Sequence, residues 1–475
     1  MAEVISRRIH IFLLLLALNG VVAVHATAQL IEAGKVIPDM VCLNDSSHSY
    51  ALYLPSYYYE SDIEEWPVIY AFDAAARGVF PVDLFQEAAE KYGYIIAGSN
   101  ISENGPWAPI LKAAENMFKD TEARFKIDQK RRYTAGFSGG ARVATSLAVL
   151  YGTFEGVIGC GAGFSNNYPP HFDLEFNYFG LIGNRDFNYQ EMYNLDDWLG
   201  KFNINHYVYE FPGVHEWPPA EYINEAVTWL EFRAMENELE WTDYGLREDY
   251  YEENSKAISD LIREERLYEA YKLSEKLISF LHGVRNTGEI ETLRDDLNKT
   301  EAVQKEIKKQ RMILEEERGY YLQYADAFVC YRINFEDSMT PIKPNSWWKE
   351  QIKIATNKMQ QIDSPMDTLL GRRMIDYIWR TAHMQYESVQ GTEYQPTSRY
   401  FLDIWAMAQP DAISPYYFLA KYYTLQGRYD KALKSLEDAI NRGLSDKNLI
   451  ESDSTLVNLT TLTEYQRLAL KLEAM

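Results

Sequence analysis

The chain has 475 residues, of which 47% are hydrophobic and 14% aromatic, and its 47 Lys and Arg against 70 Asp and Glu give a formal charge of −23. At roughly 150 residues per domain, this length predicts about three structural units and excludes one small domain, while the composition excludes a disordered chain. The negative charge excludes nucleic acid as a main partner, because such a surface repels phosphate groups on average. Cys42, Cys160 and Cys330 lie too far apart for a zinc or redox motif.

The N-terminus predicts a secretory signal peptide over residues 1–28. Two arginines and a histidine precede an apolar run at 11–24, and Ala26 and Ala28 supply the small residues that a signal peptidase requires. The apolar run is shorter than the roughly 20 residues needed to span a bilayer, and no nearby cysteine would accept a lipid. We therefore predict cleavage after Ala28 and an exported chain, periplasmic or extracellular, without stable membrane insertion.

Residues 36–235 predict an α/β domain, because short β-branched or aromatic runs alternate there with helical stretches. The predicted strands cover 49–54, 67–73, 94–99, 132–137, 156–160, 178–183 and 206–211. The predicted helices cover 83–91, 109–125, 140–151, 190–201 and 220–233. This repeated order indicates a mostly parallel sheet with helices on both faces, since parallel strands need crossover connections.

After Glu236 the strand signals stop, and the chain becomes charged helical material with few breakers. We predict a second, all-α domain over residues 253–475. The acidic stretch 236–252, which is poor in apolar periodicity, is the predicted boundary.

Within this helical half, residues 412–445 resemble a tetratricopeptide repeat. Ala420 and Ala432 would let two antiparallel helices approach closely, with Gly427 at the turn between them. Residues 267–270 look like a weaker second copy. Since one repeat cannot bury its own apolar face, we expect neighbouring helix pairs to stack with it. A groove for a protein partner and a helical annex that steadies the α/β domain are both consistent with this pattern.

The sequence Gly136-Phe-Ser138-Gly-Gly140 lies between a predicted strand and a predicted small-residue helix. This is the GxSxG pattern of a nucleophile elbow, in which the serine takes a strained conformation at a sharp turn. The residues two positions before and two positions after the serine, Gly136 and Gly140, must therefore be small. Gly139 can present its backbone N–H to an oxyanion at the start of the following helix.

A serine nucleophile needs a base downstream and a carboxylate to orient it. His206 is expected in a strand and His171 in a Pro-rich segment, whereas His215 follows the last predicted strand in a loop. That position favours His215 as the base.

Asp186 is the favoured acid, because it lies at the carboxyl end of a predicted strand and precedes His215. Asp196 and Asp197 lie in a predicted helix and are the alternatives. A turn cap or a surface ion pair is the structural alternative for Asp186.

Other residues are expected around this site. A second oxyanion donor should come from Ala74 or Ala75, after the strand that ends at Asp73. Trp107 and Trp217 are candidate walls of a substrate pocket, although a tryptophan also fills cores. Three arginines near the motifs either bind an acidic substrate group or form ion pairs. They are Arg77, Arg142 and Arg185.

Together, the elbow, the segment Gly183-Asn-Arg-Asp186 and the segment His215-Glu-Trp217 resemble the α/β-hydrolase fold, nearest the secreted esterases that include polyhydroxybutyrate depolymerases and feruloyl esterases. The resemblance covers about residues 36–235. It implies that Ser138 forms an acyl-enzyme, that His215 transfers the proton and that Asp186 holds the imidazole, without a metal or an organic cofactor.

Three functions are compatible with these residues. The favoured one is hydrolysis of carboxylic esters, on a small molecule or as acyl or feruloyl groups on a glycan. The second is peptide-bond cleavage by the same triad, because esters and amides pass through one tetrahedral intermediate. The third is a non-catalytic protein that binds a partner through its helical repeats.

Overall fold

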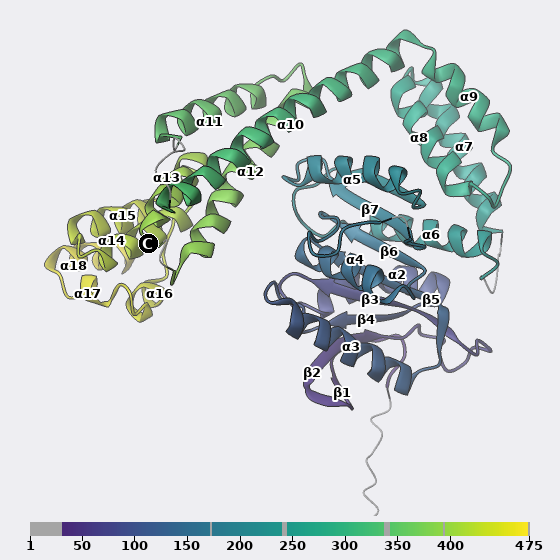
Figure 1. The fold of residues 1–475 in the computed structure, drawn as a ribbon, viewed down its shortest axis with the longest axis horizontal. Helices are drawn as coiled ribbons and strands as arrows, with labels where there is room; N and C mark the ends of the chain where they lie inside the picture. The colour runs from purple at the N-terminus through teal and green to yellow at the C-terminus, as the bar shows by residue number, and fades with distance from the viewer. Residues whose placement is uncertain (1–30, 172, 240–244, 337–342, 393–394, 474–475) are drawn as a thin grey trace, which may run out of the picture.

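The structure is a computed structural model, and it describes residues 31–171, 173–239, 245–336, 343–392 and 395–473 (Figure 1). The predicted signal peptide, residues 1–28, lies outside the described residues. Among the helices in the described ranges, none is long and apolar enough to cross a membrane.

The described part of the chain contains an eight-stranded sheet with the order β1-β2-β4-β3-β5-β6-β7-β8. The strands are β1 (Ile37–Cys42), β2 (Asp45–Tyr53), β3 (Trp66–Asp73), β4 (Ile95–Ser99), β5 (Ile127–Phe137), β6 (Gly156–Cys160), β7 (Asn177–Gly183) and β8 (His206–Phe211). β2 pairs antiparallel with β1 and β4, and all other neighbours are parallel. The carboxyl ends of β3 to β8 therefore meet at one edge, where ligands of such sheets bind.

Helices cover both faces of the sheet. They are α2 (Val79–Tyr92), α3 (Trp107–Arg124), α4 (Gly139–Tyr151), α5 (Tyr189–Lys201) and α6 (Ala220–Glu236). Alternate side chains of one strand enter different cores: Ile69 packs with α2 and α6, whereas Val68 and Tyr70 pack with α3 and α4. Strands buried on both faces in this way read as continuous apolar runs, which made them predictable.

This arrangement is a mostly parallel sheet with helices on both faces, followed by helices alone, and the predicted fold class is confirmed. The prediction missed β1, because this edge strand is mostly solvent-exposed and lacks an apolar pattern. β5 also begins five residues earlier than predicted, at Ile127, because its first half carries the exposed residues Gln129 and Lys130.

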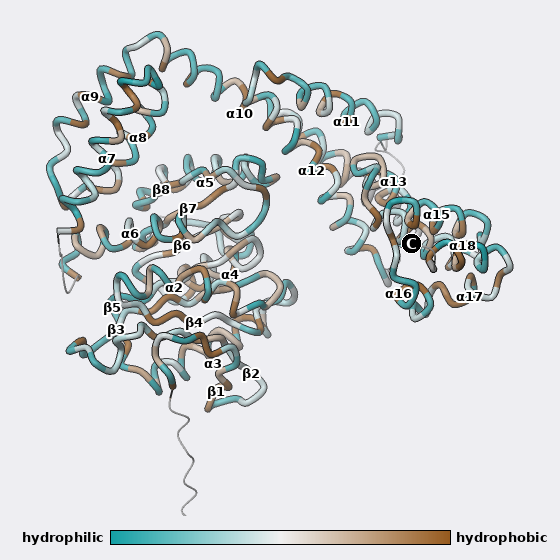
Figure 2. The backbone as a smooth tube through the Cα atoms, turned by 180° about the vertical axis from the view of Figure 1, so that it is seen from behind, coloured by the Kyte–Doolittle hydropathy of each residue, from teal (hydrophilic) through white to brown (hydrophobic). Residues whose placement is uncertain are grey.

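The rest of the described chain is helical. Its helices are α7 (Leu246–Arg263), α8 (Leu267–Leu281), α9 (Gly288–Asn298), α10 (Glu301–Glu336), α11 (Asn345–Met359), α12 (Pro365–Val389), α13 (Ser398–Ala408), α14 (Ser414–Leu425), α15 (Tyr429–Asn441), α16 (Lys447–Ser452), α17 (Val457–Thr460) and α18 (Thr463–Glu473). They do not share one core. Helices α7 to α9 lie above α6 in Figure 2 and extend its core, where the rings of Tyr250 and Phe280 stack 5.4 Å apart. Residues from α10 to α18 form a separate core.

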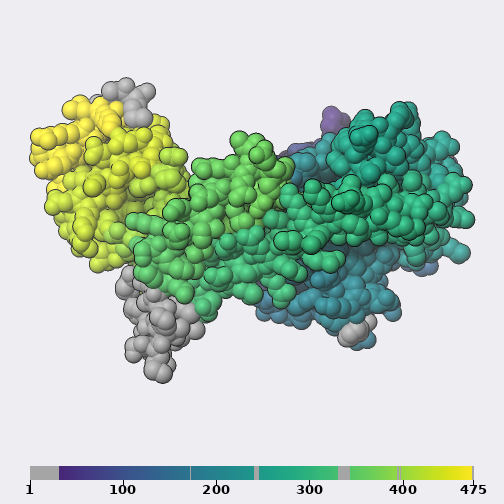
Figure 3. Space-filling model, turned by 90° about the horizontal axis from the view of Figure 1, so that it is seen from above, coloured from purple at the N-terminus to yellow at the C-terminus, as the bar shows by residue number. Residues whose placement is uncertain are grey.

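Helix α10 joins the two parts, with 36 residues in one uninterrupted helix. It runs from α9 across the top of the α/β domain towards α12 (Figure 1), and the helices after it extend beyond that domain on one side (Figure 3). The buried side chains of Glu317 on α10 and Arg373 on α12 form an ion pair of 2.6 Å. The last helices thus attach to the α/β domain through α10 and α12.

The predicted repeat falls on α14 and α15, which pack against each other with Ala420 and Ala432 fully buried between them. Gly427 has a φ of +66° at the turn, a conformation that glycine adopts without strain. The assignment of this pair to the tetratricopeptide family stays a prediction, as do the domain boundaries. The predicted boundary stretch includes the start of α7, and Tyr250 there contacts the shared core.

A buried ion pair fixes α6 to the sheet. The guanidinium of Arg131 on β5 donates to the carboxylate of Glu231 on α6, and both side chains are almost inaccessible. The Tyr94 hydroxyl also donates to Glu231 and accepts a bond of 3.0 Å from Arg131. Each charge therefore depends on the other, because an unpaired charge in this core has no water to stabilise it.

Replacing Glu231 with Ala should lower the free energy of unfolding of the α/β domain by about 3–5 kcal/mol, since it leaves the Arg131 charge buried without its partner. Urea denaturation measures the change. The matched control is Glu350→Ala, which breaks an exposed pair with Lys353 and should leave the midpoint unchanged. Equal midpoints for the two variants would contradict the role assigned to the buried pair.

Candidate active site

Ser138 occupies the sharp turn between β5 and α4, with φ 55° and ψ −119°. Its backbone N–H donates a 2.9 Å hydrogen bond to the carbonyl of Cys160 on the neighbouring strand. A Cβ on Gly136 would lie 2.2 Å from the Gly140 carbonyl oxygen, and a Cβ on Gly140 would lie 2.0 Å from that of Phe72. The glycines are therefore required because backbone from α4 and β3 approaches where side chains would be.

Three predicted side chains form one hydrogen-bonded chain at this turn. The Ser138 hydroxyl lies 2.9 Å from Nε2 of His215, and Nδ1 of His215 lies 2.9 and 2.8 Å from the two carboxylate oxygens of Asp186. With the proton of the imidazole on Nδ1, the ring donates to Asp186 and accepts from Ser138. The side chains of His215 and Asp186 are only 9% and 1% exposed, so little water competes for these bonds.

The loop after β7 holds Asp186 from both sides. The backbone N–H of Asn188 donates to the Asp186 carboxylate at 2.8 Å, and the amide of Asn188 donates to the Gly161 carbonyl at 2.8 Å. The N–H of Arg185 donates to the carbonyl of Gly213 at 2.9 Å. This last bond ties the loop of the acid to the loop of the base.

The alternative bases and acids have other surroundings. His206 lies in β8, where its ring bonds the Ile204 carbonyl at 2.7 Å and approaches Asp196 to 3.4 Å. Asp197 is exposed on α5, and His171 is exposed in a loop. None of these hydrogen-bonds the hydroxyl of Ser138 in the described structure.

Gly139, Ala74 and Asn104 meet beside Ser138. Gly139 is the first residue of α4, and a Cβ on it would lie 1.7 Å from the side-chain oxygen of Asn104. The N–H of Asn104 donates to the carbonyl of Ala74 at 2.9 Å. Sequence reasoning did not single out Asn104. The available signal was its place in a Gly-Pro loop after β4, whose carboxyl end lies at the same edge of the sheet.

Trp217 has a packing role in this structure. Its indole is 6% exposed, and Nε1 donates a 2.7 Å hydrogen bond to the buried carboxylate of Asp73. Burial opposes ionisation of Asp73, but hydrogen bonds from Arg77, Trp217 and the N–H of Ala75 outweigh it and hold the pKa of this carboxyl below its usual value. The indole therefore orders the loop that contains Ala74, and a contact between Trp217 and substrate stays a prediction.

Aromatic side chains surround the base. The rings of Phe137 and Phe187 lie 4.7 and 4.5 Å from the imidazole of His215. Trp107 is half-buried, begins α3 three residues after Asn104, and packs edge-on against Tyr168 at 5.6 Å. Trp107 stays a candidate for substrate contact.

Two of the three predicted arginines form ion pairs. Arg77 binds Asp73 at 2.8 Å, and Arg142 binds Glu191 at 2.8 Å. The half-buried Arg185 side chain makes neither a hydrogen bond nor an ion pair with any described residue.

The helical half contributes residues that the motifs did not predict. Arg373 on α12 donates to the carbonyl of Asn184 at 2.8 Å, two residues before Asp186, and its guanidinium covers the Tyr189 ring at 4.0 Å. Seven residues further along α12, the guanidinium of Arg380 lies 5.2 Å from the centre of the Phe187 ring. A helix encoded far away in the sequence thus borders the loop of the acid.

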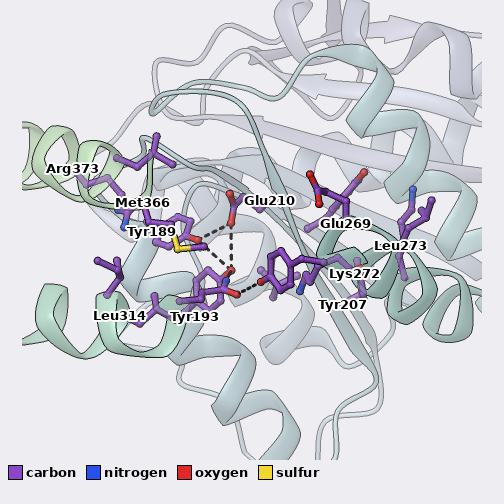
Figure 4. A pocket seen from close by; sticks show the side chains of 17 residues that line it. Tyr189, Tyr193, Tyr207, Glu210, Glu269, Lys272, Leu273, Leu314, Met366 and Arg373 are labelled. Atoms are coloured by element: carbon purple, nitrogen blue, oxygen red, sulfur yellow. Dashed lines mark hydrogen bonds between the residues drawn. The ribbon is translucent and has the colours of Figure 1, made fainter. Parts of the chain in front are cut away.

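A separate cavity of about 430 Å³ lies where α8, α10 and α12 meet α5 and β8. Tyrosines dominate its wall, and the hydroxyls of Tyr189 and Tyr193 donate to Glu210 at 2.6 and 3.3 Å (Figure 4). The residues that line this cavity do not include Ser138 or His215. Among the described residues, no group of three or more His, Cys, Asp and Glu is arranged to hold a metal ion.

Comparisons with known proteins give structural likeness only. No protein-family model matches the chain, and no curated protein does. Among solved structures, a fluorophosphonate-binding serine hydrolase F of Staphylococcus aureus is 13% identical with a TM-score of 0.35, covering 42% of this chain and 98% of its own. A ferulic acid esterase is 16% identical with a TM-score of 0.34, covering 41% and 95%. An esterase of Pyrobaculum calidifontis is 10% identical with a TM-score of 0.35, covering 43% and 86%.

The close approach at Gly140 gives a stability prediction. Gly140→Ala places a methyl group against a β3 carbonyl that cannot move aside, and it should lower the free energy of unfolding by about 3 kcal/mol. Gly319→Ala is the matched control, because open space surrounds Gly319 within α10. That substitution should raise the free energy by about 0.5–1 kcal/mol through helix propensity. Urea denaturation of both proteins tests this, and equal effects would contradict the steric argument.

Proposed function

We propose that the chain is an exported serine hydrolase that cleaves carboxylic esters. The observation that carries the proposal is the unbroken hydrogen-bonded chain from Ser138 through His215 to Asp186, with Ser138 half-buried at a strained turn. A serine becomes nucleophilic at neutral pH when a positioned base takes its proton, and a buried carboxylate stabilises the resulting imidazolium.

The proposed reaction has two halves. Oγ of Ser138 attacks the ester carbonyl carbon while Nε2 of His215 takes the hydroxyl proton, and the resulting oxyanion accepts N–H bonds from Gly139 and Ala74. Collapse of the intermediate breaks the C–O bond, and His215 returns the proton to the departing alcohol. Water then attacks the acyl-enzyme with His215 again as the base, which releases the acid and restores Ser138.

The proposed setting is outside the cytoplasm, because residues 1–28 have the sequence pattern of a signal peptide. There the substrates would be small-molecule esters or acyl and feruloyl esters of glycans. A peptidase with the same triad is the second candidate, because esters and amides pass through one tetrahedral intermediate. A protein partner bound through the helical repeats is compatible with either activity.

Ser138→Ala should reduce turnover of short-chain p-nitrophenyl esters by about 10⁶-fold, and Asp186→Asn by about 10⁴-fold, because the acid orients and stabilises the base. A fluorophosphonate should label the wild-type protein and not Ser138→Ala. Ser146→Ala is the matched control, since Ser146 is buried on the same helix and bonds only backbone in the described structure. Labelling that persists in Ser138→Ala would contradict the assignment.

A substrate panel separates the candidate activities. Purified residues 29–475 should hydrolyse p-nitrophenyl butyrate or methyl ferulate faster than the matching anilides. Faster cleavage of peptide amides would make the chain a peptidase. Absence of both activities, together with absence of fluorophosphonate labelling, would leave a binding protein.

Arg373 should act as a positioning residue, because it fixes the loop of Asp186 through the Asn184 carbonyl. Arg373→Met alone leaves Glu317 buried and unpaired, so the test uses Arg373→Met with Glu317→Leu, which removes both charges. In this double variant kcat should fall about tenfold while KM stays unchanged, since misplaced catalytic groups slow the chemical step. Glu317→Gln, which keeps Arg373, should retain most of kcat. A double variant with wild-type kcat would assign Arg373 to stability alone.

A further inference from the structure

Helix α12 brings a second arginine to the proposed active site. Arg373 bonds the loop of the acid, and Arg380 lies seven residues later, two helical turns along the same face. The guanidinium carbon of Arg380 is 5.2 Å from the centre of the Phe187 ring, and that ring is 4.5 Å from the imidazole of His215. A single aromatic ring therefore separates this cation from the proposed catalytic base.

Among the residues that the structure describes, none forms a hydrogen bond with the side chain of Arg380. Its guanidinium also lies 4.5 Å from the ring of Trp379, and within the described ranges it makes no ion pair with a carboxylate. Its Nε is buried without any acceptor. Stacking on aromatic rings satisfies the faces of a guanidinium but leaves its N–H donors, which lie in the plane, unused.

The neighbouring carboxylates are engaged elsewhere. Asp376, one turn earlier on α12, accepts a 2.9 Å bond from Nε1 of Trp379. Asp186 is bonded to His215 and to the N–H of Asn188. Arg380 therefore differs from Arg77, Arg142 and Arg373, whose side chains each bind a carboxylate.

Two carboxylates, those of Asp376 and Asp186, are the charged groups that act on Arg380. Burial lowers the pKa of Arg380, while the charges of Asp376 and Asp186 oppose this shift, and an arginine keeps its proton at neutral pH in such surroundings. Burial raises the pKa of Asp376 and outweighs the Trp379 hydrogen bond and the charge of Arg380, which lower it. A substrate carboxylate would give Arg380 the two parallel bonds that its N–H donors lack.

We propose that Arg380 forms an anion-binding subsite of the active site, so that the preferred esters carry a carboxylate close to the ester bond. This inference rests on the proposed function, because Ser138 must cleave the ester whose carboxylate Arg380 binds. The subsite belongs to the helical half, which gives that half a direct part in substrate selection. The chemistry fits half-esters of short dicarboxylic acids on the acyl side, or acidic alcohols on the leaving-group side.

The first experiment compares p-nitrophenyl hemisuccinate with p-nitrophenyl butyrate, which match in length and differ in charge. Wild-type protein should prefer the hemisuccinate in kcat/KM, and Arg380→Gln should lower the ratio of the two kcat/KM values by about 10- to 100-fold, the worth of a charge-assisted bond. Arg380→Lys should restore part of the ratio. Arg372→Gln is the matched control, because Arg372 is exposed on the same helix. An unchanged ratio in Arg380→Gln would overturn the proposal.

Two further measurements determine where the substrate carboxylate lies and which arginine binds it. 4-Acetoxybenzoate and phenyl acetate differ by a carboxylate on the leaving group, whereas the hemisuccinate and butyrate esters differ on the acyl group. The pair whose kcat/KM ratio changes in Arg380→Gln shows which side of the ester Arg380 binds. Arg185→Gln tests the arginine next to Asp186, whose side chain also has no hydrogen bond or ion pair with a described residue. Selectivity that depends on Arg185 rather than on Arg380 would overturn the proposal.

A binding measurement separates the subsite from the catalytic proposal. Calorimetric titration of Ser138→Ala with monomethyl succinate should show binding that weakens about 10-fold or more when Arg380→Gln is added. Binding that depends on Arg380 without hydrolysis by the wild type would support the subsite and refute the esterase. Hydrolysis with no dependence on Arg380 would refute the subsite alone, and absence of both hydrolysis and binding would refute both.

Discussion

The backbone turn at Ser138 is the constraint on which the rest of the site depends. A non-glycine residue with φ 55° is strained, and here the turn persists because α4 packs directly on the β3 backbone through Gly140 and because the Ser138 N–H bonds β6. The same parallel order brings the loops after β3, β5, β7 and β8 to one edge. The base, the acid and the oxyanion donors therefore come from separate loops, and their distances follow from the strand spacing.

The predictable features were those with a local cause. Strands buried on both faces give continuous apolar runs, the elbow has its own glycine spacing, and Asp186 and His215 each follow a strand at the active edge. β1 was missed because an exposed edge strand carries no such run. Trp217 was predicted at the pocket from its position beside His215, whereas its hydrogen bond to Asp73 could not be predicted because that acceptor is distant in sequence. Arg373 and Arg380 belong to an amphipathic helix. Its contact with the loop of Asp186 could not be predicted, because the two segments are far apart in the sequence and no local pattern pairs them.

The helical half is built into the α/β domain at two places. Helices α7 to α9 complete a core that the sheet and α6 leave open, and α12 reaches the loop of Asp186 through Arg373. The Glu317 carboxylate stabilises the contact between Arg373 and the acid loop. Arg373 is fully buried, and without this partner its charge would lower the free energy of unfolding. The loop of Asp186 is therefore held in part by a side chain from the helical half.

The choice of arginine at position 380 follows from this packing. Between the rings of Phe187 and Trp379, an ammonium group would lose its hydration and shift towards the neutral form, whereas a guanidinium keeps its charge and stacks on both rings. Substrate selectivity then arises from the difference in binding free energy between a neutral ester and an ester that carries a carboxylate. A neutral ester leaves the Arg380 donors without acceptors in a poorly hydrated place, and a substrate carboxylate satisfies them, so the cost of the unpaired cation becomes discrimination between the two substrates. The formal charge of −23 makes such a cation more valuable, since the average surface repels acidic substrates and the subsite must attract them locally.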